Sequence, residues 1–110
     1  MFSLFAKKYK TISPSEAKSR LGDRNVLLLD VRTPSEYKSI RIPNSISVPL
    51  NNIKHDIVNV AKNKDTEIIV YCQSGARASS ACNELVNMGY TNISNLGGIM
   101  SWRYETVSGR

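Results

Sequence analysis

The clearest chemical potential in this sequence lies in residues 72–77, where Cys72 and Arg77 are separated by four small or polar residues. A cysteine thiolate is a strong nucleophile, and positive charge nearby favours the thiolate over the thiol. The guanidinium of Arg77 would supply such a charge close to Cys72. The pair therefore indicates nucleophilic cysteine chemistry. It needs no histidine base, and the single histidine, His55, lies elsewhere in the sequence.

The elements expected around this segment favour the same chemistry. An apolar run at residues 67–71 predicts a buried strand that leads into Cys72, and the loop after it opens a helix. Open α/β sheets bind ligands beyond the carboxyl ends of such strands. Gly75 lets the backbone amides turn inward, and the helix adds free N–H groups and the positive end of its dipole. We therefore expect an anion cradle and substrate-binding loop made by Gln73, Ser74, Gly75, Ala76, Arg77 and Ala78.

The two cysteines also have structural interpretations. Cys72 could be a small buried hydrophobic residue at the end of a strand. Cys82 falls on an apolar stripe of the following helix, which favours core packing. Alternatively, Cys82 could act as a resolving thiol for Cys72. The helical turns between the two residues make a direct disulfide geometrically unfavourable.

Strand and helix signals alternate along the rest of the chain. Helix starts are predicted at Ser13, at Thr33, and at Asn51 or Asn52, the first two with a glutamate three residues after the cap. We expect strands at residues 9–12, 26–31, 45–48, 67–71 and 91–93, a tight turn at 96–98, and a final helical segment with Ile99 and Trp102. This alternation predicts an α/β fold, a small open and mainly parallel sheet with helices on both faces.

Composition and charge limit the class of protein. With 41% apolar and 22% charged residues, the 110-residue chain fits one soluble domain at residues 9–110, preceded by a basic segment at residues 1–8. No apolar run approaches the ~18 residues of a membrane span. The net charge is +6. Much of it comes from residues 1–24, which carry six basic and two acidic side chains. We interpret this basic strip as a solvated surface, with no nucleic-acid partner and no stable membrane anchoring.

The sequence has two cysteines and one histidine. These are too few for a small scaffold held together by several disulfides, and they argue against a zinc site. We therefore expect a cytoplasmic protein that uses neither a metal nor an organic cofactor.

Four segments resemble, in order and spacing, the signatures of the rhodanese family of sulfurtransferases. They are residues 28–37, residues 42–50, the loop segment 70–78, and a closing signature at 89–93 and 96–99 with Trp102. The resemblance extends from about Thr11 to Trp102 and implies a rhodanese-like fold with a single domain.

The resemblance also implies a mechanism. Cys72 would attack the outer sulfur of an anionic donor, thiosulfate or a persulfide, hold that sulfur as a persulfide, and pass it to cyanide or a thiol. A protein could be the persulfide donor or the thiol acceptor. Arg77 would orient the donor or bond to the carbonyls of the loop. Asp30 and Arg32 would brace the site, with a plain salt bridge or a direct substrate contact as alternatives. Glu36 would cap a helix and could also pair with Arg32.

Two other functions remain open. Many rhodanese-like domains are non-catalytic binding modules, but these have typically lost the cysteine that this chain keeps as Cys72. Cysteine phosphatases and arsenate reductases use a similar cradle. The phosphatases have five residues between cysteine and arginine, whereas the four found here favour a smaller target.

The sequence departs from the family pattern near the expected rim of the site. The middle signature commonly reads Gly-His-Ile-Pro-Gly-Ala, but here Arg41 replaces the histidine and Asn44 replaces the second glycine. Asn44 can still adopt the left-handed conformation of glycine. Gln73 is neutral where related loops often carry a basic residue, which would weaken affinity for small dianions. We expect Arg41, Arg77 and Arg103 to form a basic rim.

Overall fold

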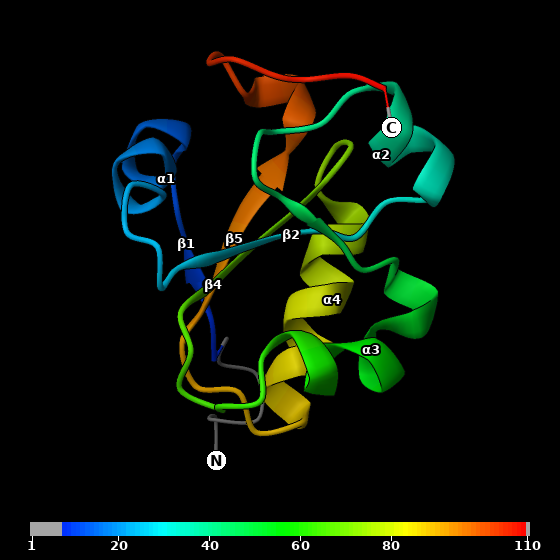
Figure 1. Cartoon of the computed structure of the whole chain (residues 1–110). Helices are drawn as coiled ribbons and strands as arrows, with labels where there is room; N and C mark the ends of the chain where they lie inside the picture. The colour runs from blue at the N-terminus through cyan, green and yellow to red at the C-terminus, as the bar shows by residue number, and fades with distance from the viewer. Residues whose placement is uncertain (1–7, 110) are drawn as a thin grey trace.

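A computed structural model describes residues 8–109 as a five-stranded parallel sheet with helices on both of its faces (Figure 1). The strands follow the spatial order β1-β5-β4-β2-β3, and each neighbouring pair is parallel. Their bounds are β1 Lys10–Thr11, β2 Leu27–Asp30, β3 Ile46–Ser47, β4 Ile68–Cys72 and β5 Ile93–Gly98. The predicted fold class is therefore confirmed.

Within residues 8–109, four α-helices and one short 3-10 segment connect the strands, and a second 3-10 segment follows β5. Their bounds are α1 Pro14–Arg20, α2 Pro34–Ser39, α3 Ile53–Val60, α4 Ala76–Asn87, η2 Leu50–Asn52 and η3 Ile99–Ser101. Both predicted capping boxes form: Ser13 begins α1 with Glu16, and Thr33 begins α2 with Glu36. Each box satisfies backbone N–H groups that the helix start leaves unpaired.

The sheet is buried on both faces because successive side chains of β4 alternate between two hydrophobic clusters. Val70 and Cys72 pack on the face covered by α3 and α4, together with Leu85. Tyr71 packs on the opposite face with Ala17 of α1. All five residues of β4 are buried, which explains the continuous apolar run in the sequence. The core therefore fixes β4 and, with it, the position of Cys72.

The end of the chain differs from the sequence prediction. β5 runs from Ile93 to Gly98, so the residues expected to form a tight turn belong to a strand. The register of β5 against β4 shifts between Val70 and Tyr71, so the pairing is irregular there. Tyr71 pairs with Gly97, whose φ is +92°. The final helix is only the three-residue η3 segment. Asn52 does precede α3, but its side chain makes no capping hydrogen bond.

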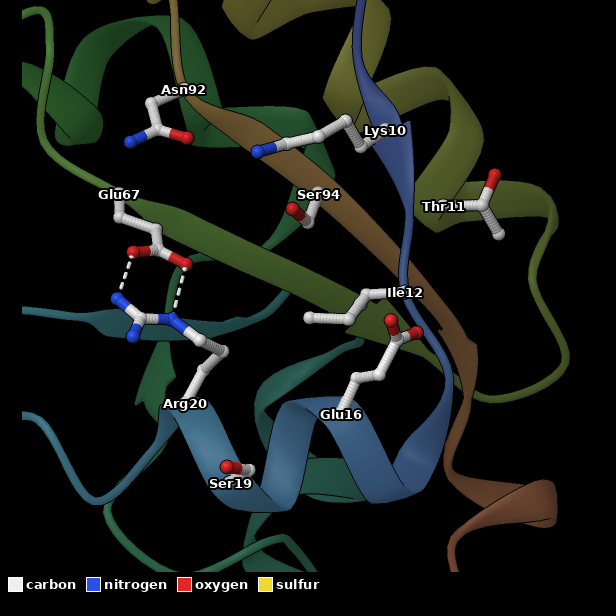
Figure 2. A pocket seen from close by; sticks show the side chains of 9 residues that line it. All are labelled: Lys10, Thr11, Ile12, Glu16, Ser19, Arg20, Glu67, Asn92 and Ser94. Atoms are coloured by element: carbon white, nitrogen blue, oxygen red, sulfur yellow. Dashed lines mark hydrogen bonds and ion pairs between the residues drawn. The ribbon is translucent and has the colours of Figure 1, made fainter.

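A polar hollow of about 470 Å³ lies at the amino ends of β4 and β5, the edge of the sheet opposite Cys72 (Figure 2). Arg20 of α1 crosses it and donates hydrogen bonds of 3.1 and 2.5 Å to the carboxylate of Glu67. These hydrogen bonds lower the pKa of Glu67. The hollow thus marks where α1 is tied to the sheet, away from the cysteine segment.

Within residues 8–109, none of the helices has the length and apolar character needed to cross a bilayer. The predicted basic segment at residues 1–8 falls almost entirely outside this described part of the chain.

Candidate active site

Cys72 is the last residue of β4, and its side chain faces the amino end of α4. The side chain is buried, with 1% of its surface exposed. The backbone N–H of Gly75 donates a hydrogen bond of 3.0 Å to Sγ of Cys72. Gly75 has φ +124°, a conformation that L side chains rarely adopt, and it occupies the N-cap position of α4. Negative charge on the sulfur is therefore stabilised by a backbone donor and by the positive end of a helix.

The predicted cradle, residues 73–78, consists of a tight loop at residues 73–75 and the start of α4, and we call residues 73–77 the active-site loop. Ser74 and Ala76 are exposed, whereas Ala78 is buried in the first turn of α4. The amides of the first helical turn lack acceptors within the helix, so those of Ala76 and Arg77 can donate to an anion. The arrangement can therefore hold an anionic group against the Cys72 sulfur.

Gly98 at the end of β5 sets the position of the active-site loop. A Cβ atom at Gly98 would lie 2.3 Å from the carbonyl oxygen of Gln73 and 2.7 Å from Cα of Ser74. The N–H of Met100 also donates to the Gln73 carbonyl, at 3.3 Å. Sequence analysis did not assign Gly98 a role at the site. The Gly97-Gly98 pair was the available signal, because glycine within a strand often marks a close backbone approach.

Arg32 braces the active-site loop from within the protein. Its guanidinium donates to both carboxylate oxygens of Asp30, and both side chains are buried. The same group donates to Oε1 of Gln73 at 3.2 Å and to the carbonyl of Ile40 at 2.6 Å. Because a buried guanidinium with several acceptors has little freedom, it fixes the Gln73 side chain. The expected salt bridge between Asp30 and Arg32 is therefore present, and the bracing role stays a prediction.

Arg77 does not bond to the loop carbonyls but forms a bidentate ion pair with Glu36 of α2. The two hydrogen bonds are 2.7 and 3.1 Å long. Hydrogen bonds from Arg77, and then from the Thr33 backbone, lower the pKa of Glu36 to about 2. The Glu36 carboxylate conversely raises the pKa of Arg77. The prediction that Glu36 pairs with Arg32 is therefore wrong, because Asp30 already occupies that guanidinium.

Arg41, one of the residues expected to form a basic rim, is tied to the C-terminal segment. Its guanidinium donates to the carbonyls of Tyr37 and Gly109, at 3.3 and 2.5 Å. Its backbone pairs with Val107 in an antiparallel bridge. The C-terminal segment thus crosses the carboxyl edge of the sheet and reaches α2 (Figure 1). Asn44 has φ +67°, as expected for a residue that replaces glycine.

Cys82 lies in the core of the α3/α4 face with no exposed surface. Burial, and to a lesser degree the nearby Cys72, raises the pKa of Cys82 to about 12. Its thiol therefore stays protonated at neutral pH, and the prediction of core packing is confirmed. Both cysteines are free.

No group of three or more histidine, cysteine or acidic side chains placed to hold a metal ion occurs within residues 8–109. The surroundings of the Cys72 sulfur are suited to nucleophilic attack by a thiolate.

Known proteins resemble this chain over most of its length. The model of the family described as "Rhodanese-like domain" matches residues 13–105. A "Sulfurtransferase" of Allochromatium vinosum is 38% identical over 93 residues, covering 83% of this chain and 85% of that protein. "Thiosulfate sulfurtransferase GlpE" of Pseudomonas syringae is 32% identical over 107 residues, covering 93% of this chain and 98% of the relative.

Solved structures give the same result. A crystal structure of a rhodanese-related protein from Thermoplasma volcanium matches with a TM-score of 0.77 and 27% identity, covering 90% of this chain and 98% of that one. The chain belongs to the family of rhodanese-like domains. The resemblance inferred from the sequence motifs is therefore confirmed.

Proposed function

We propose that this chain is a sulfurtransferase in which Cys72 carries the transferred sulfur as a persulfide. The observation that supports this most directly is the Cys72 sulfur at the start of α4, with the Gly75 amide 3.0 Å away. The curated relatives named sulfurtransferases support the reaction class. A thiolate in this position is a ready nucleophile, and its persulfide is equally an anion that the same amides stabilise.

The proposed reaction has two balanced steps. The Cys72 thiolate attacks the outer sulfur of the donor, the donor's bond to that sulfur breaks, and the remainder leaves as an anion such as sulfite. An acceptor, cyanide or a thiol, then attacks the outer sulfur of the persulfide. The Cys72 thiolate is the leaving group and is regenerated. Residues 73–78 would bind the donor, while Asp30 and Arg32 would hold Gln73 in place.

We further propose that the donor is an anionic sulfur compound and that the acceptor is thiophilic. A protein could supply the persulfide or accept the sulfur. Two free cysteines suit a reducing compartment, which supports a cytoplasmic location as part of the proposal.

Formation of thiocyanate from cyanide and a sulfur donor tests the function. We expect Cys72→Ser to lower the rate at least about a hundredfold, because a serine oxygen cannot form the persulfide. Circular dichroism should show that this nearly isosteric variant stays folded. Cys82→Ala is the matched control and should keep most of the activity, because the Cys82 thiol is protonated and buried.

Two outcomes would contradict the proposal. Thiocyanate formation by Cys72→Ser at the wild-type rate would exclude Cys72 as the sulfur carrier. A loss at Cys82→Ala as deep as that at Cys72→Ser, with the fold intact, would instead indicate a second essential thiol.

A further inference from the structure

The polar hollow at the amino ends of β4 and β5 holds side chains that the cysteine chemistry leaves unused (Figure 2). Cys72 ends β4 and pairs with Gly98, so it lies at the opposite edge of the sheet. The walls of the hollow come from β1, α1 and the residues that lead into β4 and β5. Its volume of about 470 Å³ is enough for a small organic molecule.

Ser94 of β5 brings a nearly buried hydroxyl group to the hollow. The residue is 2% exposed, and Figure 2 shows its oxygen directed into the space that the residue lines. Within residues 8–109, no group forms a hydrogen bond with this hydroxyl. Buried polar groups in proteins nearly always have a hydrogen-bond partner. The hydroxyl therefore needs a partner that enters the hollow, either water or a ligand.

Two opposite charges on the walls of the hollow are also unpaired. Lys10 of β1 forms no hydrogen bond or ion pair with the described residues, and Figure 2 shows its side chain directed across the hollow. Glu16 of α1 closes the capping box by accepting a hydrogen bond of 2.9 Å from the Ser13 backbone. Within the same part of the chain, Glu16 belongs to no ion pair. The hollow thus offers one ammonium and one carboxylate to a ligand.

The remaining charged side chains of the hollow neutralise each other. Arg20 donates hydrogen bonds of 3.1 and 2.5 Å to the carboxylate of Glu67. A simple anion would be attracted by Lys10 but repelled by two carboxylates, and a simple cation would meet the opposite balance. A molecule that carries both charges satisfies Lys10 and Glu16 together. Ile12 lines the same hollow and adds an apolar surface for a carbon chain.

We propose that this hollow is a binding site for a small zwitterionic amino acid. The carboxylate of the ligand accepts hydrogen bonds from Lys10 and from the Ser94 hydroxyl, and its ammonium group donates to Glu16. Its carbon chain lies against Ile12. The site lies at the opposite edge of the sheet from Cys72, so the inference does not depend on the proposed sulfur transfer.

Four small probes of similar size separate the contributions of the two charges. 5-Aminopentanoate and its isomer norvaline carry both charges, far apart in the first and adjacent in the second. Pentanoate carries only the carboxylate, and pentylamine carries only the ammonium. Each is titrated at pH 7 into the full-length, nitrogen-15-labelled protein while the backbone amide signals are followed by NMR.

At least one zwitterion should bind about fivefold more tightly than both single-charge probes, which is the gain expected from one further ion pair at a partly exposed site. The shifted signals should centre on the strands that line the hollow, at Thr11 and Ser94, and not on the active-site loop. Comparison of the two zwitterions then shows whether the ligand carries separated or adjacent charges.

Three variants test the assigned contacts one at a time. Lys10→Met should remove the preference of the zwitterion over pentylamine but keep its preference over pentanoate, because the ammonium still meets Glu16. Glu16→Gln should give the reverse pattern, and its glutamine can still complete the capping box of α1. Ser94→Ala should weaken the zwitterion about threefold through loss of one hydrogen bond. General damage to the fold would weaken all four probes together, which distinguishes it from the loss of a contact.

Matched controls remove the same charges elsewhere. Lys38→Met on α2 and Glu84→Gln on α4 change residues that do not line the hollow, so both should leave the four affinities unchanged.

Equal affinities of the zwitterions and the single-charge probes, or no binding of any probe, would overturn the inference and leave water as the partner of Ser94. Signals that shift at the active-site loop instead of the hollow would also overturn it, as would zwitterion binding that survives both Lys10→Met and Glu16→Gln unchanged.

Discussion

Glu36 combines a structural and an electrostatic role in one side chain. Its Oε1 atom accepts hydrogen bonds from the Thr33 backbone at 2.9 Å and from Arg77 at 2.7 Å. The capping role could be predicted from the sequence because Thr33 and Glu36 have the spacing of a capping box. The partner Arg77 could not, because it lies 41 residues away and the contact depends on how α2 meets the start of α4. A local contact such as a capping box can thus be predicted from the sequence, whereas an ion pair between two separate elements cannot.

Replacement of Glu36 by glutamine should change the pH dependence of stability. The folded-state pKa is about 2, below the ordinary value of 4.5. The ionised carboxylate therefore stabilises the fold above pH 4.5, and this contribution is lost as the pH falls from 4.5 towards 2. Urea unfolding should show wild type more stable than Glu36→Gln at pH 7 by about 1 kcal/mol, since the pair is partly exposed. The difference should shrink below pH 4.5.

A stability difference between these two proteins that stays constant from pH 7 down to the lowest pH at which both remain folded would contradict this assignment. Glu84→Gln serves as the control, since Glu84 is paired only at the surface with Lys54.

The contact between β5 and the active-site loop is a feature of the secondary-structure arrangement that the sequence does not predict. The strand before Cys72 was predictable, because a run of buried apolar residues has a distinct pattern. The end of β5 was not, since Leu96, Gly97 and Gly98 combine turn-forming residues with a strand ladder. The missing information is tertiary: Gly98 is needed because the Gln73 carbonyl would be 2.3 Å from a Cβ atom.

Gly98→Ala should therefore impair sulfur transfer more than it impairs folding. The new methyl group must displace the backbone of the active-site loop, and a shift of about 1 Å at a reacting centre can reduce activity about a hundredfold. Kinetics with a fixed donor, together with thermal unfolding, measure the two effects. Gly22→Ala is the control, because a Cβ atom there would make an ordinary contact at 3.5 Å. An unchanged rate for Gly98→Ala would show that this contact does not position the loop.

At the scale of the whole molecule, the alternation of strands and helices carried enough information to predict the parallel sheet covered on both faces. The inner strands β2 and β4 need side chains that are buried on both faces of the sheet, and this requirement shapes their composition directly. The route of the C-terminal segment was not predictable. Its attachment to Arg41 includes backbone pairing and a carbonyl contact at Gly109, which leave no pattern in the sequence.

Removal of residues 2–8 should leave both the fold and sulfur transfer unchanged. The first strand begins at Lys10, and the family match begins at residue 13. Urea unfolding should give a free energy of unfolding within about 0.5 kcal/mol of that of the full chain. A clear loss of stability or of activity would show that the domain extends into this segment.

Intact-mass analysis after incubation with a sulfur donor tests the central claim most directly. Wild type, Cys72→Ser and Cys82→Ala would each be treated with thiosulfate and with benzenethiosulfonate and then analysed before and after reduction with dithiothreitol. We predict that wild type and Cys82→Ala gain one sulfur atom, that reduction removes it, and that Cys72→Ser gains none. A reducible gain on Cys72→Ser, or no gain on folded wild-type protein with either donor, would contradict the account.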